Sequence, residues 1–147
     1  MKLFWPVCQI QSWALVDDVR GGQRRPLGQG SHGMTRYLIS FDDGAMTFPE
    51  EELPAVGEAA HAVVRAAQEA GVWIFGGGVE SQRASIVATD GTVTDGPYPE
   101  TKEVLGGFAV VDVPSREEAL EWAAKIAVAC RCAQDVREFL PDPAVGN

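Results

Sequence analysis

The stretch TDGPYPETKE, residues 94–103, lies between two apolar segments and fits neither a helix nor a regular strand. Its Asp-Gly-Pro order predicts a turn, because glycine tolerates positive φ and each proline fixes φ near −65°. The two prolines also bias the residues before them, Gly96 and Tyr98, toward extended geometry. We therefore expect a stiff loop that presents the carboxylates of Asp95 and Glu100, the Tyr98 phenol and the Lys102 ammonium group, and loops of this kind commonly carry function.

The chain on either side of this loop alternates between strand and helix patterns. Short apolar runs predict strands at residues 37–41, 72–75, 84–89, 92–94, 107–113 and 133–139. Two apolar stripes at helical spacing predict helices that begin at Pro49 and Ser115, and Gly71 is expected to end the first. Ser115 and Glu118 form a capping box. The resulting order is β-α-β, a hairpin, and β-α-β.

Glycines are expected to shape the sheet at two places. Asp90-Gly91 predicts a type I′ turn between the two hairpin strands. The triplet at residues 76–78 is expected to end or bulge its strand, and to let the backbone come close to Gly106-Gly107. We do not interpret this triplet as a phosphate loop, because it lacks a Gly-Lys-Ser/Thr sequence and a following helix N-terminus.

Apolar side chains are predicted on both faces of the sheet. The pairs expected to share a face are Trp73 with Phe75, Phe108 with Val110, and Ala109 with Val111. Two helices can cover only one face of a sheet, so the other face needs a different cover. We therefore predict a homodimer in which two copies stack their helix-free sheet faces.

The segment DGPYPETKE, followed by LGGF at 105–108 and EALEWA at 118–123, resembles the signature of the YCII-related proteins of the DGPF type. The resemblance extends over about residues 34–139, and Tyr98 stands where the motif usually has phenylalanine. It implies an α+β fold, a ferredoxin-like β-α-β-β(-β)-α-β sheet with two helices on one face, assembled as a dimeric α+β barrel. It brings no established reaction, and we expect no cofactor and no metal.

Residues 1–33 differ in composition from the rest of the chain. They hold four basic and two acidic residues and are rich in glycine near their end. Two explanations stay open: a start codon assigned too early or an added leader, and a flexible native extension. We predict a YCII-related/DGPF domain at 34–140 and a tail at 141–147.

Charge and cysteine content exclude several classes of protein. Residues 34–147 hold eight basic and 19 acidic side chains, a net charge of −11, which disfavours binding to nucleic acid. No apolar run approaches the roughly 20 residues that cross a bilayer, so we expect a cytoplasmic protein with no membrane partner. Cys8, Cys130 and Cys132 lack zinc-site spacing and are expected to be reduced thiols.

His61 and Asp95 are the candidate catalytic residues. His61 lies at the flank of the apolar stripe of the first helix, and Asp95 begins the Asp-Gly-Pro turn. The resemblance implies a His–Asp pair with its histidine on this helix, in which the carboxylate orients the imidazole for proton transfer. The structural alternatives are a boundary histidine and an aspartate that bonds its own turn backbone.

Tyr98, Glu100 and Lys102 are candidate substrate-binding residues. Lys102 could hold an anionic substrate, and Glu100 could bond a backbone amide or pair with Lys102. The Tyr98 ring could line a pocket. The alternatives are a solvated surface ion pair and a ring that covers the edge of the sheet.

Two functions stay open at this point. The first is a cofactor-free enzyme that performs acid–base chemistry on a small organic molecule in a cleft of the dimer, as resemblance to a superfamily with lactone isomerases and small monooxygenases implies. The second is a non-catalytic small-molecule-binding or regulatory module linked to sigma-factor signalling, since genes of the family often neighbour alternative sigma factors. The fold alone does not decide between them.

Overall fold

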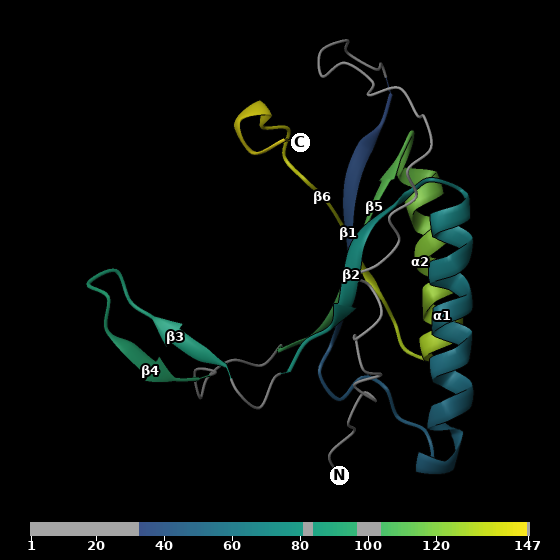
Figure 1. Ribbon diagram of the computed structural model, residues 1–147, viewed down its shortest axis with the longest axis horizontal. Coiled ribbons are helices and arrows are strands. Elements are labelled where there is room, and N and C mark those ends of the chain that lie inside the picture. The colour runs from purple at the N-terminus through teal and green to yellow at the C-terminus, as the bar shows by residue number, and fades with distance from the viewer. Residues whose placement is uncertain (1–32, 81–83, 97–103, 147) are drawn as a thin grey trace, which may run out of the picture. The chain divides into compact units, whose positions relative to one another are not determined.

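The computed structural model describes residues 33–80, 84–96 and 104–146 (Figure 1). The chain divides into two units, Met1–His32 and Gly33–Asn147, and the second contains all the described elements. These elements are β1 (Thr35–Asp42), η1 (Glu50–Glu52), α1 (Leu53–Glu69), β2 (Trp73–Gly78), β3 (Ser85–Val87), β4 (Val93–Asp95), β5 (Leu105–Val113), α2 (Arg116–Cys130), β6 (Asp135–Glu138) and η3 (Pro143–Val145).

Four of the strands form one antiparallel sheet in the order β2-β5-β1-β6. Both helices lie against the same face of this sheet, as Figure 1 shows. β3 and β4 pair with each other in a separate two-stranded sheet. The predicted α+β, ferredoxin-like architecture is therefore confirmed.

The hydrophobic core fills the space between the helices and the sheet. Every second residue of β5 from Gly107 to Val113 is buried, as expected for a strand with one face on a core. The buried cluster consists of Tyr37, Ile39, Ala67, Val72, Ala109, Val111, Val113, Ala119, Trp122 and Ala123. This cluster fixes which face of each strand points to the helices, because a slip of one residue would expose the whole apolar set.

The helix ends follow the predicted signals. Three glutamates occupy η1, directly before α1, where the helix dipole favours negative charge. Gly71 adopts a φ of +73° just after α1, a conformation that ends helices and suits glycine. The Ser115 side chain accepts a hydrogen bond from the Glu118 amide at 3.2 Å, which confirms the predicted cap of α2.

The Arg131 side chain connects the end of α2 to the start of α1. Arg131 adopts a left-handed φ of 55° as it ends α2. Its guanidinium forms an ion pair with Glu52 and lies 5.9 Å from the centre of the Phe48 ring. These contacts tie the segment before α1 to the C-terminal end of α2.

The glycine triplet does not end β2 but continues it to Gly78. An irregularity between Trp73 and Phe75 places Trp73 opposite Val111 and Phe75 opposite Val110. The prediction that Trp73 and Phe75 share a face is therefore wrong. Because the bulge adds one residue to the strand, Trp73 packs against the core while Phe75 points to the helix-free face.

The hairpin turn also differs from its prediction. A type I′ turn needs positive φ at both central residues, but among the described residues Arg131 is the only one other than glycine with positive φ. Hydrogen bonds from the Gly91 amide to the Ala88 carbonyl, and from the Ala88 amide to the Thr92 carbonyl, enclose a three-residue loop instead. Gly91, with a φ of +84°, takes the left-handed position that such loops require.

Candidate functional site

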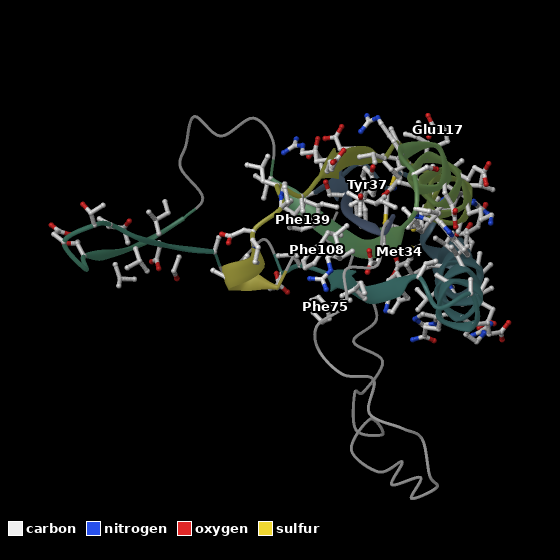
Figure 2. The ribbon with its side chains drawn as sticks, turned by 90° about the horizontal axis from the view of Figure 1, so that it is seen from above. Met34, Tyr37, Phe75, Phe108, Glu117 and Phe139 are labelled. Carbon is white, nitrogen blue, oxygen red and sulfur yellow. The ribbon has the colours of Figure 1, made fainter. Side chains whose placement is uncertain are left out.

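The helix-free face of the sheet is apolar at its centre. The strand register aligns Leu38, Val110 and Phe75 across β1, β5 and β2, so the three residues share this face. The Phe75 ring lies 5.7 Å from the Phe108 ring at a tilt of 56° (Figure 2). Phe75 is nevertheless 62% exposed, although a ring of this size would contribute strongly if it were buried. An aromatic surface is therefore left open to a partner or a ligand.

Polar groups border this apolar centre on its β6 side. Asp135 lies opposite Ser40 and Arg137 lies opposite Leu38, so all four share the helix-free face. The Arg137 guanidinium contacts the Asp135 carboxylate at 3.4 Å. Ser40 is only 6% exposed and lies between Asp135 and Phe108 in register. The face thus offers a charged pair beside its apolar centre, whereas the Ser40 residue is buried.

The two predicted catalytic residues come from different elements. His61 lies on α1 and is exposed, next to the buried Ala60. Asp95 is the last residue of β4, lies opposite Ser85 and is also exposed. Within the described ranges 33–80, 84–96 and 104–146, no hydrogen bond or ion pair joins their side chains. Both groups are accessible to a ligand, and their pairing stays a prediction.

The three predicted substrate-binding residues, Tyr98, Glu100 and Lys102, lie outside the described residues. The described chain ends before them at Gly96, whose amide donates to the Ala84 carbonyl at 2.9 Å, and resumes at Val104. Val104 in turn accepts a hydrogen bond from the Asp43 amide. The described residues that flank this segment are therefore Gly96, at the end of the hairpin, and Val104, beside the end of β1.

Asp90 and Tyr37, which the sequence did not indicate as acid–base groups, have shifted pKa values. The backbone amide of Thr92 donates to the Asp90 carboxylate at 2.9 Å and lowers the pKa of that carboxyl. Burial, followed by the charge of Glu138, raises the pKa of Tyr37, whose hydroxyl donates to the Glu138 carboxylate at 3.4 Å. The Asp-Gly pair in a predicted hairpin turn was the sequence signal that could have indicated the shifted pKa of Asp90. The spacing of Tyr37 and Glu138 gave no signal for the shifted pKa of Tyr37.

The two described cysteines are unsuited to nucleophilic chemistry. Burial raises the pKa of Cys130 to about 11, and it also raises the pKa of Cys132. Both are free thiols, and Cys132 accepts a hydrogen bond from the Gln134 side-chain amide at 3.3 Å. Thiols with raised pKa values hold little thiolate at neutral pH. In the described ranges, no three histidine, cysteine or acidic side chains gather as a metal site would require.

Comparison with known protein families matches residues 35–138 to the YCII-related domain. The chain therefore belongs to the YCII-related domain family. A search of proteins with curated functions finds no match. In the described part of the chain, neither helix has the length and apolar character needed to cross a membrane.

Proposed function

We propose that this protein is a homodimer whose two copies stack their helix-free sheet faces and bind a small organic molecule in a cleft of the dimer. His61 and Asp95 then move a proton to and from that molecule without a cofactor. The observation that carries the proposal is the apolar centre of the helix-free face, where Phe75 remains 62% exposed beside Phe108. Such a surface is buried more often by a partner than left in water.

The composition of this face supports an identical subunit as the partner. Stacked sheets interdigitate side chains from their inner faces, and the aligned Leu38, Val110 and Phe75 supply such a layer. A two-fold axis would place the same apolar centre of a second copy against it. The charged pair of Arg137 and Asp135 lies toward β6, as expected for the polar rim of an interface.

The exposure of His61 and Asp95 supports a role toward a ligand. Proton transfer requires that the acid or base can reach the substrate, and neither side chain is buried in the core. An enolisable carbonyl compound or a lactone is the substrate class that such a pair can process without a metal or a redox group. The neutral thiols of Cys130 and Cys132 are not used.

A second candidate is a non-catalytic small-molecule-binding or regulatory module, linked to sigma-factor signalling. It is favoured by the separate placement of His61 on α1 and Asp95 on β4, with no hydrogen bond between them in the described chain. Such a module needs the apolar surface of the helix-free face but no acid–base pair.

Proton NMR in deuterated buffer separates the two candidates. A panel of small lactones and enolisable carbonyl compounds is incubated with the protein, and both ligand binding and deuterium incorporation next to the carbonyl are measured. The acid–base proposal predicts incorporation that His61→Gln and Asp95→Asn each reduce at least about 100-fold, the scale of general acid–base catalysis. The exposed Glu121→Gln on α2 is the matched control and should not reduce it.

Binding without deuterium incorporation would instead support the binding module. If deuterium incorporation is as fast in His61→Gln and Asp95→Asn as in wild type, these two residues are not the acid–base groups. Sedimentation velocity on the same samples tests the dimer, which Phe75→Asp should dissociate because it places a carboxylate in the apolar centre.

A further inference from the structure

The β3–β4 hairpin carries a small apolar surface of its own. Val87 and Val93 lie directly opposite each other and are 67% and 62% exposed. Asp95 follows Val93 by two residues in the same strand, so it lies on the same side of the hairpin. We refer to the side of the hairpin formed by Val87, Val93 and Asp95 as the valine face.

This hairpin has few internal means of stability. Each strand is three residues long, and the two strands pair only with each other. A two-stranded hairpin is marginally stable in water unless its apolar side is packed on something else. Val87 and Val93 are the large apolar side chains that such packing would cover.

The position of the hairpin in the chain indicates what covers it. The hairpin is inserted between β2 and β5, which are neighbours in the main sheet. These two strands supply Phe75 and Phe108, the rings at the centre of the helix-free face. Along the chain, the hairpin therefore lies between the two strands that hold the aromatic part of the proposed dimer interface.

We propose that the β3–β4 hairpin is an arm that packs its valine face on a second copy of this chain, next to the stacked sheet faces. Because Asp95 shares the valine face, the arm holds its carboxylate at the junction between the two copies. The acid–base site is then incomplete in a single copy. This inference rests on the dimer proposed above.

Amide hydrogen exchange of wild type and Phe75→Asp tests the arm without altering it. Phe75 is exposed, so the variant is expected to fold, and circular dichroism checks this. In the monomeric variant the hairpin amides, such as those of Ala88 and Gly91, should exchange at least about tenfold faster than in the wild-type dimer. Amides between β1 and β5 should not change. Equal hairpin exchange in monomer and dimer would overturn the arm.

The double variant Val87→Thr/Val93→Thr tests the same contact by affinity. Threonine keeps the branched shape and strand preference but adds a hydroxyl. The dimer dissociation constant should rise at least about tenfold. A tenfold change corresponds to about 1.4 kcal/mol of binding free energy, which is less than the free energy that the full burial of two valine side chains contributes. Val128→Thr on α2, where valine is 80% exposed, is the matched control and should change it less than about twofold.

The outcomes separate the arm from the dimer. If Phe75→Asp dissociates the dimer while the double valine variant has the same dimer dissociation constant as Val128→Thr, the packing of the hairpin on the second copy is refuted and the dimer of stacked sheet faces is supported. If the wild-type protein sediments as a monomer at all concentrations, both are refuted. If both variants weaken the dimer and the control does not, the arm is supported.

Discussion

Replacement of Gly76 by alanine should destabilise the protein, whereas the same change at Gly77 should not. A Cβ at Gly76 would lie 2.6 Å from the Phe108 carbonyl oxygen, 2.8 Å from the Ala109 Cα and 2.8 Å from the Trp73 ring. A Cβ at Gly77 would meet nothing within 4 Å. Both glycines lie in β2, and neither is among the described residues with positive φ, so the two sites differ mainly in space.

The geometry sets the size of the effect. Two of the three contacts at Gly76 are with the backbone of β5, which cannot yield without moving the strand, and overpacking of this kind costs about 1–3 kcal/mol. At Gly77, alanine removes the entropic penalty of glycine in a strand, about 0.5–1 kcal/mol. Because the same entropic gain applies at Gly76, the two variants should differ by the overpacking cost, about 1–3 kcal/mol. At about 4 °C per kcal/mol, this corresponds to melting temperatures that differ by about 4–12 °C.

Urea denaturation of wild type and both variants, followed by tryptophan fluorescence, measures these free energies. Each curve is recorded at two protein concentrations, because Gly77 shares the helix-free face with Phe108 and an effect on a dimer would depend on concentration. If Gly76→Ala and Gly77→Ala differ by less than about 0.5 kcal/mol, the close approach of β2 to β5 is not what fixes this edge of the sheet.

Three further predictions concern the helix cap, the hairpin turn and the thiols. Ser115→Ala should lower the free energy of unfolding by about 1 kcal/mol, measured by urea denaturation, and Ser115→Asp should restore most of it. The Asp90 carboxylate, whose pKa is lowered by the Thr92 amide, stabilises the turn above the unfolded pKa of about 3.9. That contribution is lost as the pH falls through the pKa that Asp90 has in the folded protein. The chemical shift of the Thr92 amide should therefore change with pH below about 3.9 in wild type and not in Asp90→Asn. Cys130, with a pKa of about 11, should react with iodoacetamide at pH 7.5 at least about 100-fold more slowly than glutathione, and denaturant should abolish the difference.

The sequence predicted the elements that depend on local chemistry. The capping serine, the glutamates before α1 and the glycine after it act within a few residues of their own position, so their signals are visible in the chain. The ferredoxin-like order followed from these elements and from the family resemblance. Their bounds differ from the predictions by a few residues, as expected for signals that extend over a turn.

The sequence did not predict the features that depend on contacts between distant segments. The bulge in β2 arises where the strand pairs with β5, and alternation alone placed Phe75 on the same face as Trp73. The hairpin turn has the same Asp-Gly pair that a type I′ turn favours, but the strand pairing puts three residues in the loop and leaves only Gly91 left-handed. In both cases the partner strand decided between alternatives that the local sequence allowed.

The candidate site shows why its chemistry is harder to predict than its fold. His61 belongs to a helix that the core holds in place, whereas Asp95 belongs to a hairpin outside the main sheet. The position of His61 is therefore a property of the folded subunit, whereas in the proposed dimer the position of Asp95 depends on the second copy that packs on Val87 and Val93. A carboxylate orients an imidazole for proton transfer only when the two side chains come within hydrogen-bond reach of each other. In the proposed dimer, formation of the acid–base pair thus depends on the packing of the hairpin, so exchange of the hairpin amides tests the proposed site as well as the proposed dimer.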